Sequence, residues 1–333
     1  MKKPFLLVVA FALLASCSQN EEIACQETPF MFRMNQQNTL RSTVEYNSTN
    51  LPDSFMVEAI YTAPNGDKKV YFKSGAARVG NTNTYELVDG RYFWPAEGTL
   101  SFYAYAFAGD LTLSEGATSE KMINFSNPTD DSQSDFIYAV TTDCSKATHS
   151  AGVNLFFKQA LSQIRVAAIN RNPTTTVEIN YVRFVDLAGE SGSIFHFPTT
   201  TTAADNDIIG SWSGNTNSSA YWHAFESLWY DGSNNVMIPT SATDAAELLS
   251  NNLRMVPQKA DQVRMLVNCT IKTAGVINFS GEREVIIVNV DWNPGVCYTY
   301  NLIFDKGEGM TTLINFSVDV NDYVSVPDED LEV

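Results

Sequence analysis

The feature that most constrains this chain is a series of short runs rich in aromatic and β-branched residues, separated at close intervals by Asn, Asp, Gly and Pro. The clearest runs are residues 55–61, 99–107, 154–170, 177–186, 263–271, 284–292, 297–304 and 313–320. Residues of this kind favour extended backbone, and the residues between the runs are those that turns require. The pattern predicts an all-β fold whose strands are stacked as β-sandwiches.

The last of these runs alternates with a two-residue period. Its apolar positions are Ile314, Phe316, Val318 and Val320, and its polar positions are Asn315, Ser317 and Asp319. Because successive side chains of a strand point to opposite faces, we expect one face of this strand to be buried and the other to face water.

The first seventeen residues have the order of a bacterial secretion signal. Two lysines precede an apolar stretch over residues 4–14, and Leu-Ala-Ser then leads into Cys17. This order is typical of a signal peptide, and the apolar run is shorter than the roughly 20 residues of a membrane-spanning helix. We therefore predict a signal peptide over residues 1–16 and a lipid on Cys17 that ties the mature chain to a membrane. A plain signal peptide followed by a chance cysteine is the alternative.

Charge and composition narrow the classes of function. The formal net charge is −17, and removal of the two lysines of the signal takes it to −17 − 2 = −19. Such a surface repels phosphates, so nucleic acid is excluded as a partner. Apolar residues make up 44% of the chain, which is enough for a folded core. The length exceeds that of a single typical core and predicts two domains, with the polar stretch 141–152 as their boundary.

No motif for catalysis or for a cofactor is present. The three histidines, His149, His196 and His223, form no spaced metal pattern and lie in no nucleophile motif. Acidic residues gather at 130–135 and 327–332, but they lack the ordered spacing and the glycine of a calcium loop. We interpret them as solvated turns. The sequence predicts no enzyme, no metal site and no cofactor.

The cysteines other than Cys17 are widely spaced and include no CxxC pair. They are Cys25, Cys144, Cys269 and Cys297. Export permits a disulfide, and Cys269 with Cys297 is the best pairing because both lie in strand-like runs of the same half. Isolated buried thiols are the alternative, and this is the one we expect.

Three tryptophans interrupt a stretch rich in Thr, Ser, Asn and Gly. They are Trp212, Trp222 and Trp229. Aromatic side chains of this kind pack in loops and cores, which is the commoner use, or they form a platform on which sugars stack. The second interpretation supports an alternative function, a surface β-sandwich lipoprotein that binds glycans.

Several of the strand-like segments also match a family. They are Gly-Arg-Tyr-Phe-Trp-Pro at 90–95, Leu-Ser-Phe-Tyr-Ala-Tyr-Ala at 100–106, Ser-Asp-Phe-Ile-Tyr-Ala at 134–139, residues 153–164, Met-Val-Pro-Gln at 255–258, and Trp-Asn-Pro-Gly at 292–295 leading into Tyr298. In this order the chain resembles the fimbrillin-like lipoproteins, the subunits of type V pili of anaerobic gut and oral bacteria. Gln159 stands where that family usually has His, and Tyr323 stands near a common Trp.

The resemblance implies two tandem transthyretin-like Greek-key β-sandwiches, over residues 42–150 and 151–333, after a lipidated propeptide at 17–41. In the family, the lipoprotein reaches the outer membrane and an arginine-specific protease cuts after an N-terminal arginine, which releases one strand of the first domain. By resemblance, the cleavage site is Arg41, which lies in a polar stretch. Arg33 is the weaker alternative, because it lies inside the strand that is displaced.

The family also implies how subunits join. Loss of the strand opens a groove that a strand of another subunit fills, so the partners are other fimbrial subunits, with host proteins or glycans as further partners. We expect the donated strand within residues 313–333, with its apolar positions entering the groove. Those positions are Ile314, Phe316, Val318 and Val320. The role implied is structural and adhesive, at the cell surface.

Overall fold

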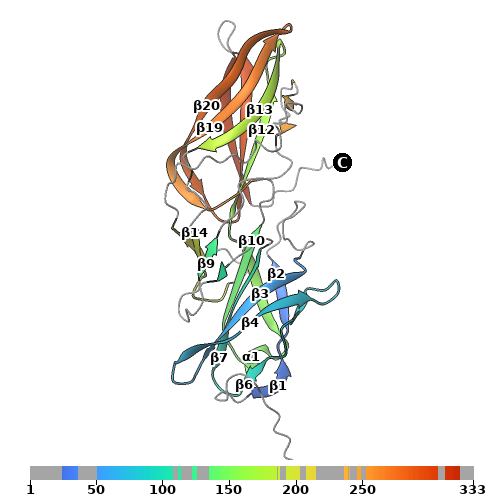
Figure 1. The fold of residues 1–333 in the computed structure, drawn as a ribbon, viewed down its shortest axis with the longest axis vertical. Helices are drawn as coiled ribbons and strands as arrows, with labels where there is room; N and C mark the ends of the chain where they lie inside the picture. The colour runs from blue at the N-terminus through green and yellow to red at the C-terminus, as the bar shows by residue number, and fades with distance from the viewer. Residues whose placement is uncertain are drawn as a thin grey trace, which may run out of the picture.

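The computed structural model is an elongated molecule in which two bodies of β-sheet follow one another along the long axis (Figure 1). The structure describes residues 25–36, 51–107, 112–113, 122–125, 135–185, 187, 193–202, 208–214, 236–238, 240, 246–248, 253–306 and 312–322. Regular structure within these ranges consists of strands and one short helix, α1 (Lys146–His149). The all-β prediction is confirmed. No helix in these ranges is long and apolar enough to cross a membrane.

Seven strands of the lower body close into a barrel in the order β10-β11-β2-β5-β4-β3-β7. Their bounds are β2 (Phe32–Gln36), β3 (Ser54–Thr62), β4 (Lys68–Arg78), β5 (Thr84–Leu87), β7 (Thr99–Phe107), β10 (Phe136–Cys144) and β11 (Val153–Gln159). Neighbouring strands are antiparallel, except that β11 runs parallel to β2. One continuous path of hydrogen bonds surrounds a core of aromatic side chains.

The lower end of the barrel carries a two-stranded sheet. Strand β1 (Cys25–Pro29) pairs antiparallel with β6 (Phe93–Pro95). Helix α1 lies beside these strands in Figure 1. The N-terminal part of the described chain therefore contributes one strand to this small sheet and the next strand to the barrel itself.

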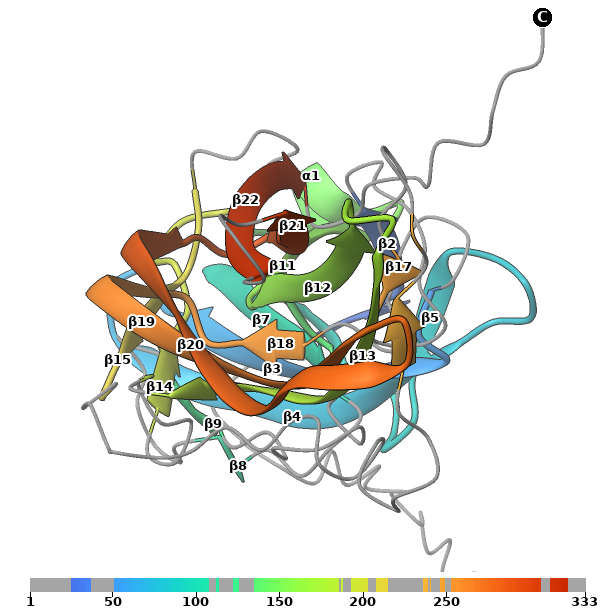
Figure 2. The same ribbon diagram turned by 90° about the horizontal axis from the view of Figure 1, so that it is seen from above.

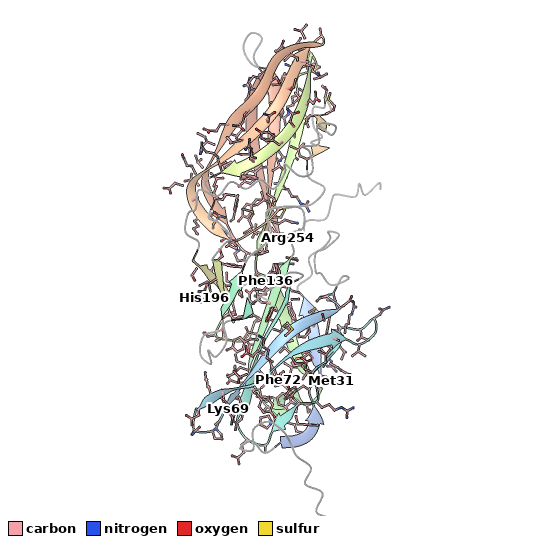
Figure 3. The ribbon with its side chains drawn as sticks, viewed as in Figure 1. Met31, Lys69, Phe72, Phe136, His196 and Arg254 are labelled. Carbon is pink, nitrogen blue, oxygen red and sulfur yellow. The ribbon has the colours of Figure 1, made fainter. Side chains whose placement is uncertain are left out.

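A small sheet covers the outer face of β7 and β10 near the junction of the two bodies. Its order is β15-β14-β9-β8, with β15 (Ser211–Ser213), β14 (Ser193–His196), β9 (Met122–Phe125) and β8 (Thr112–Leu113). Aromatic side chains fill the space between: Phe136, whose position Figure 3 labels, packs edge-on against Phe195 at 5.0 Å between ring centroids. This second aromatic cluster joins the barrel to the chain that follows it.

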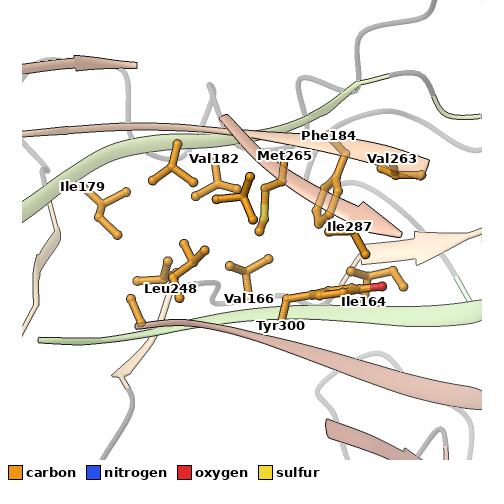
Figure 4. Packing of buried hydrophobic residues seen from close by; sticks show 14 of the residues in the cluster. Ile164, Val166, Ile179, Val182, Phe184, Leu248, Val263, Met265, Ile287 and Tyr300 are labelled. Carbon is orange, nitrogen blue, oxygen red and sulfur yellow. The ribbon is translucent and has the colours of Figure 1, made fainter. Parts of the chain in front are cut away.

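The upper body is a sandwich of two sheets (Figure 2). One contains β17 (Ala246–Glu247), β12 (Ser162–Asn170), β21 (Val296–Lys306) and β22 (Thr312–Asp322), with β18 (Leu253–Met255) also paired to β12. The other contains β16 (Val236–Ile238), β13 (Thr175–Val185), β19 (Gln258–Thr273) and β20 (Val276–Trp292). Figure 4 shows the core between them, where Met265 and Ile287 of one sheet face Val166 and Tyr300 of the other.

The chain passes from the barrel to the sandwich through two buried residues, Ala160 and Leu161. The Ala160 carbonyl accepts a hydrogen bond from Trp212 Nε1 at 2.9 Å, and the Leu161 carbonyl accepts one from Gly295 N at 2.9 Å. The boundary predicted between residues 150 and 151 falls too early, because β11 follows it and pairs with β10 and β2 of the barrel. Of the polar stretch 141–152, residues 141–144 end strand β10 and residues 145–152 connect β10 to β11.

Candidate functional site: strand β2 in the barrel

Strand β2 is the most N-terminal strand of the barrel and has a neighbour on each side. It pairs parallel with β11, from Phe32↔Val153 to Gln36↔Phe157, and antiparallel with β5 at Phe32↔Tyr85 and Arg33↔Thr84. Burial alternates along Phe30-Met31-Phe32-Arg33-Met34, with Phe30, Phe32 and Met34 buried and Met31 and Arg33 exposed, as expected of a strand with one buried face. Without β2, the barrel would have two free edges, at β11 and at β5.

The inward face of this segment fills the barrel. Phe30, Phe32 and Met34 are all buried, at 4%, 0% and 2% exposure. Phe30 packs edge-on against Trp94, with 4.8 Å between ring centroids, and Phe32 packs edge-on against Phe102 at 5.3 Å. The segment thus supplies three consecutive inward side chains of the aromatic core, in the region where Figure 3 labels Phe72 and Met31.

Backbone hydrogen bonds hold the segment on both sides. The Val153 amide donates to the Met31 carbonyl at 2.8 Å, and the Met34 amide donates to the Asn83 carbonyl at 2.9 Å. Gly152 permits the first contact: its φ is +118°, and a Cβ there would lie 3.1 Å from the Met31 carbonyl oxygen. These bonds are those of an ordinary barrel strand, and any other strand in the same place could make them.

The outward face of β2 is polar. The Arg33 side chain is exposed, and the Asn35 side chain donates to Asn154 Oδ1 at 3.5 Å. The backbone of Arg33, however, is paired on both sides, with Asn154 of β11 and Thr84 of β5. Of the two arginines predicted as cleavage sites, Arg33 therefore lies within the barrel wall, while Arg41 lies outside the described residues.

Trp94 links β6 to the barrel core and to α1. Its ring contacts Phe30 on one side and stacks with His149 at 6.3 Å on the other. Burial lowers the pKa of His149. His149 Nε2 is 3.7 Å from the Cys144 sulfur, but burial, with the nearby Asp143 carboxylate, raises the pKa of the Cys144 thiol to about 12. A thiol so far from ionising is not a nucleophile at neutral pH, so this pair is structural.

Strand β22, which contains the four residues predicted to be donated, pairs in this structure with β21 of its own chain. The register sets Ile314 opposite Phe304, Phe316 opposite Leu302, Val318 opposite Tyr300, and Val320 opposite Tyr298. All four β21 residues belong to the core of the sandwich. Among the described strands β22 pairs with β21 alone, so it is an edge strand of its sheet.

Trp212, the described member of the predicted sugar-binding tryptophans, takes part in packing. Its ring lies edge-on to Phe195 at 5.1 Å and to Phe136 at 6.1 Å, and its Nε1 donates to the Ala160 carbonyl. The half-buried Trp212 ring thus has the packing role that is the commoner use of such tryptophans. Trp222 and Trp229 lie outside the described residues.

The remaining candidates give no reactive site in the described part of the chain. His196 Nε2 lies 2.6 Å from Ser213 Oγ, on the exposed surface between β14 and β15, and no carboxylate among the described residues contacts this histidine. Asp135 is buried and accepts hydrogen bonds from Gln159 Nε2 at 2.9 Å and from the Phe136 amide at 3.0 Å. No group of three potential metal ligands occurs in the ranges described.

Three of the cysteines are isolated buried thiols, which is the second of the two alternatives that the sequence left. Cys144, Cys269 and Cys297 are buried thiols, and Cys269 and Cys297 form no disulfide. Cys17, His223 and Tyr323 lie outside the described residues. The sequence did not indicate which strands lie beside β2. They are β11 and β5, and no local pattern identifies one strand as the neighbour of another.

Comparison with known proteins agrees with this architecture. The family model described as fimbrillin-like matches residues 37–322. A solved structure of a proposed cell adhesion protein from Bacteroides ovatus superposes with a TM-score of 0.50 at 12% identity, covering 91% of this chain and 100% of that one. A fimbrial assembly protein from Parabacteroides distasonis gives 0.41 at 13% identity, covering 88% and 99%. No curated protein matches the chain.

The family match spans most of the chain, and the chain belongs to the fimbrillin-like family. The Bacteroides ovatus structure has a similar fold to this chain. At 12% identity, the similarity supports a statement about the fold alone. Membership in this family supports a structural role in a fimbrium or in adhesion at the cell surface, with other fimbrial subunits as partners.

Proposed function

We propose that this protein is a structural and adhesive subunit of a surface fimbrium, and that subunits join when a strand of one replaces β2 of another. The observation that carries the proposal is the position of β2. It is a core strand of the barrel, and it comes before all the other barrel strands in the chain. A cut after β2 would leave every later strand of the barrel covalently joined.

The energetics favour replacement of β2 over a permanently open barrel. Loss of β2 together with Phe30 would remove three buried side chains, Phe30, Phe32 and Met34, from the core. The burial lost would be roughly 4.5–9 kcal/mol, at about 1.5–3 kcal/mol for each side chain. It would also leave the backbone groups of β11 and β5 without their partners. A strand added between these two edges satisfies both needs, which is the physical basis of strand addition.

The cleavage site in this proposal is Arg41. A protease needs to draw an extended segment into its active site, so it cuts where backbone is not held in a sheet. Arg33 is held between β11 and β5, and cutting there would require the barrel to open first. An arginine-specific protease acting after Arg41 would remove β1 and β2 together with the lipid on Cys17, which delivers the subunit to the outer membrane.

The donated segment in this proposal is the C-terminal strand. Its four apolar positions would contribute roughly 6–12 kcal/mol gross on burial, at about 1.5–3 kcal/mol each, before the costs of association and ordering. Because β22 pairs with β21 along its length, donation exchanges one paired state for another. The net gain is therefore much smaller than the gross figure.

Limited proteolysis tests the proposal. Cleavage of the purified chain by an arginine-specific protease is expected to convert it into a ladder of oligomers that resist mild heating in detergent. The variant Arg41→Gln should remain uncut and form no heat-resistant ladder, and the matched variant Arg33→Gln should behave like the unmodified chain. Cleaved protein that remains monomeric at high concentration would refute assembly by strand exchange.

A further inference from the structure

Strand β20 forms an outer edge of the upper body (Figure 1). Among the described strands it pairs with β19 alone, in a register that runs from Trp292↔Gln258 to Val276↔Thr273. An edge strand presents a row of N–H and C=O groups with which a further strand can pair. At 17 residues, β20 is the longest strand in the part of the chain that the structure describes, and its edge is correspondingly long.

Two stretches of this edge strand expose apolar side chains. Four large apolar side chains on β20 are exposed: Val276 at 66%, Ile277 at 58%, Ile286 at 46% and Val288 at 59%. The first two lie at the tip of the hairpin. Ile286 and Val288 lie mid-strand, two residues apart, and therefore share one face. Proteins normally protect edges with charges or prolines, and β20 has β-branched apolar residues at these two positions instead.

The charges beside this apolar pair are neutralised within the sheet. Glu282 pairs with Arg183 at 3.1 Å, Glu284 with Arg264 at 3.2 Å, and Asp291 with Lys259 at 2.9 Å. The whole chain carries a net charge of −17, so two copies repel over most of their surfaces. At β20 the acidic side chains already have basic partners, and a second copy can approach there at a lower electrostatic cost.

We propose that β20 is a self-association edge, at which β20 of a second copy pairs antiparallel about a two-fold axis through Ile287. This register sets Ile286 opposite Val288 of the second copy, twice, so four β-branched side chains meet on one face. Asn289, with a φ of +54°, interrupts the extended backbone beyond this pair, so the paired segment is centred on residues 286–288 and no carboxylate opposes another within it. Shifts of the axis to Glu284 or Arg283 would set glutamate against glutamate, which is destabilising.

The contact is small and its strength is modest. An interface made by one strand pair falls below about 1,200 Å² of buried surface, the range of weak and transient contacts. In solution, we expect pairing to depend on concentration. In a polymer that displays many copies in a row, weak contacts of this kind act together and can hold two polymers side by side. The pairing itself uses the uncut chain and does not depend on strand exchange.

Sedimentation velocity over a range of concentrations tests the proposal on the uncut chain. The unmodified protein should move from monomer to dimer as its concentration rises. The double variant Ile286→Lys with Val288→Lys should weaken association at least about tenfold. The double variant Ile286→Thr with Val288→Thr keeps β-branched side chains in the strand and should weaken it as well. Met237→Lys, at a site 56% exposed on another strand, is the matched control and should leave association unchanged.

Oxidative cross-linking tests the register. In a background with Cys17→Ser and Cys25→Ser, a mixture of Ile286→Cys and Val288→Cys proteins should give more cross-linked dimer than either alone, because the other thiols described are buried. An unmodified chain that stays monomeric at every concentration, or lysine variants that associate like the unmodified chain, would overturn the proposal. Association that persists in Arg41→Gln separates this edge from strand exchange.

Discussion

Replacing Phe32 by alanine tests whether β2 is a working part of the barrel in the uncut chain. The Phe32 side chain has 0% exposure and meets Phe55 and Phe102 edge-on, at 6.2 and 5.3 Å between ring centroids. Both neighbours are fixed in hydrogen-bonded strands, β3 and β7, so they have little freedom to move into the space that the ring leaves. Phe32→Ala therefore creates a cavity in the middle of the aromatic core.

The magnitude follows from burial and cavity formation together. Truncation of a buried phenylalanine to alanine costs about 3–5 kcal/mol, and rigid surroundings favour the upper part of that range. Stability of ordinary domains is about 5–15 kcal/mol, so this single change removes a large fraction of it. Arg33→Ala on the exposed face of the same strand is the matched control, with an expected effect within about 0.5 kcal/mol.

Hydrogen exchange gives the most direct readout, because two β-sheet bodies need not unfold in one step. The Val153 and Met34 amides bond across the two sides of β2 and report its opening. A loss of about 3 kcal/mol should speed their exchange by roughly a hundredfold. Amides of β19 in the other body should exchange at the unmodified rate. A change in Phe32→Ala no larger than that in Arg33→Ala would refute the view that β2 supports the barrel core.

Three further predictions concern buried groups away from β2. Burial raises the pKa of the Cys144 and Cys269 thiols from 9.0 to about 12 and about 11, so thiol reagents at pH 8 should react roughly a hundredfold or more slowly with the folded chain than with the unfolded chain. The same shifts make the free energy of unfolding depend on pH. The contribution of these thiols should be complete below pH 9 and fall as the pH rises above 9, because only the unfolded thiols then lose protons. Unfolding followed by circular dichroism from pH 7 to 11 measures this dependence. Trp212→Phe removes the donor to the Ala160 carbonyl and should cost about 1–3 kcal/mol, measurable by denaturant unfolding, whereas a tryptophan used only to bind sugar would leave stability unchanged.

Strands could be predicted from the sequence because their signal is local. The run at 99–107 is β7 with the same bounds, and the run at 313–320 lies within β22. In each case the pattern depends on neighbours one or two residues away, and a strand with one buried face requires that pattern wherever its partners lie.

Pairing could not be predicted, because it depends on residues far apart in the chain. Phe32 of β2 lies beside Val153 of β11, and no local feature of either strand indicates the other. The same limit explains the misplaced boundary. A polar stretch shows exposure to water, and the connection between β10 and β11 is as exposed as a linker between domains. The true passage, Ala160 and Leu161, is apolar because it is buried under Trp212 and Gly295.

That buried passage bears on how a subunit would carry tension within a fimbrium. Strand β11 borders β2 in the barrel and continues through Ala160 and Leu161 into β12, which runs parallel to β21. Strand β21 in turn pairs with β22 along its length. A pull on a strand in the β2 position therefore passes by hydrogen bonds to β11, along covalent backbone to β12, and by hydrogen bonds to β21 and β22. Because the passage is fixed by hydrogen bonds from Trp212 Nε1 and from the Gly295 amide and by aromatic packing, the β2 position in the barrel and the C-terminal strand are the two ends of one continuous line of strands.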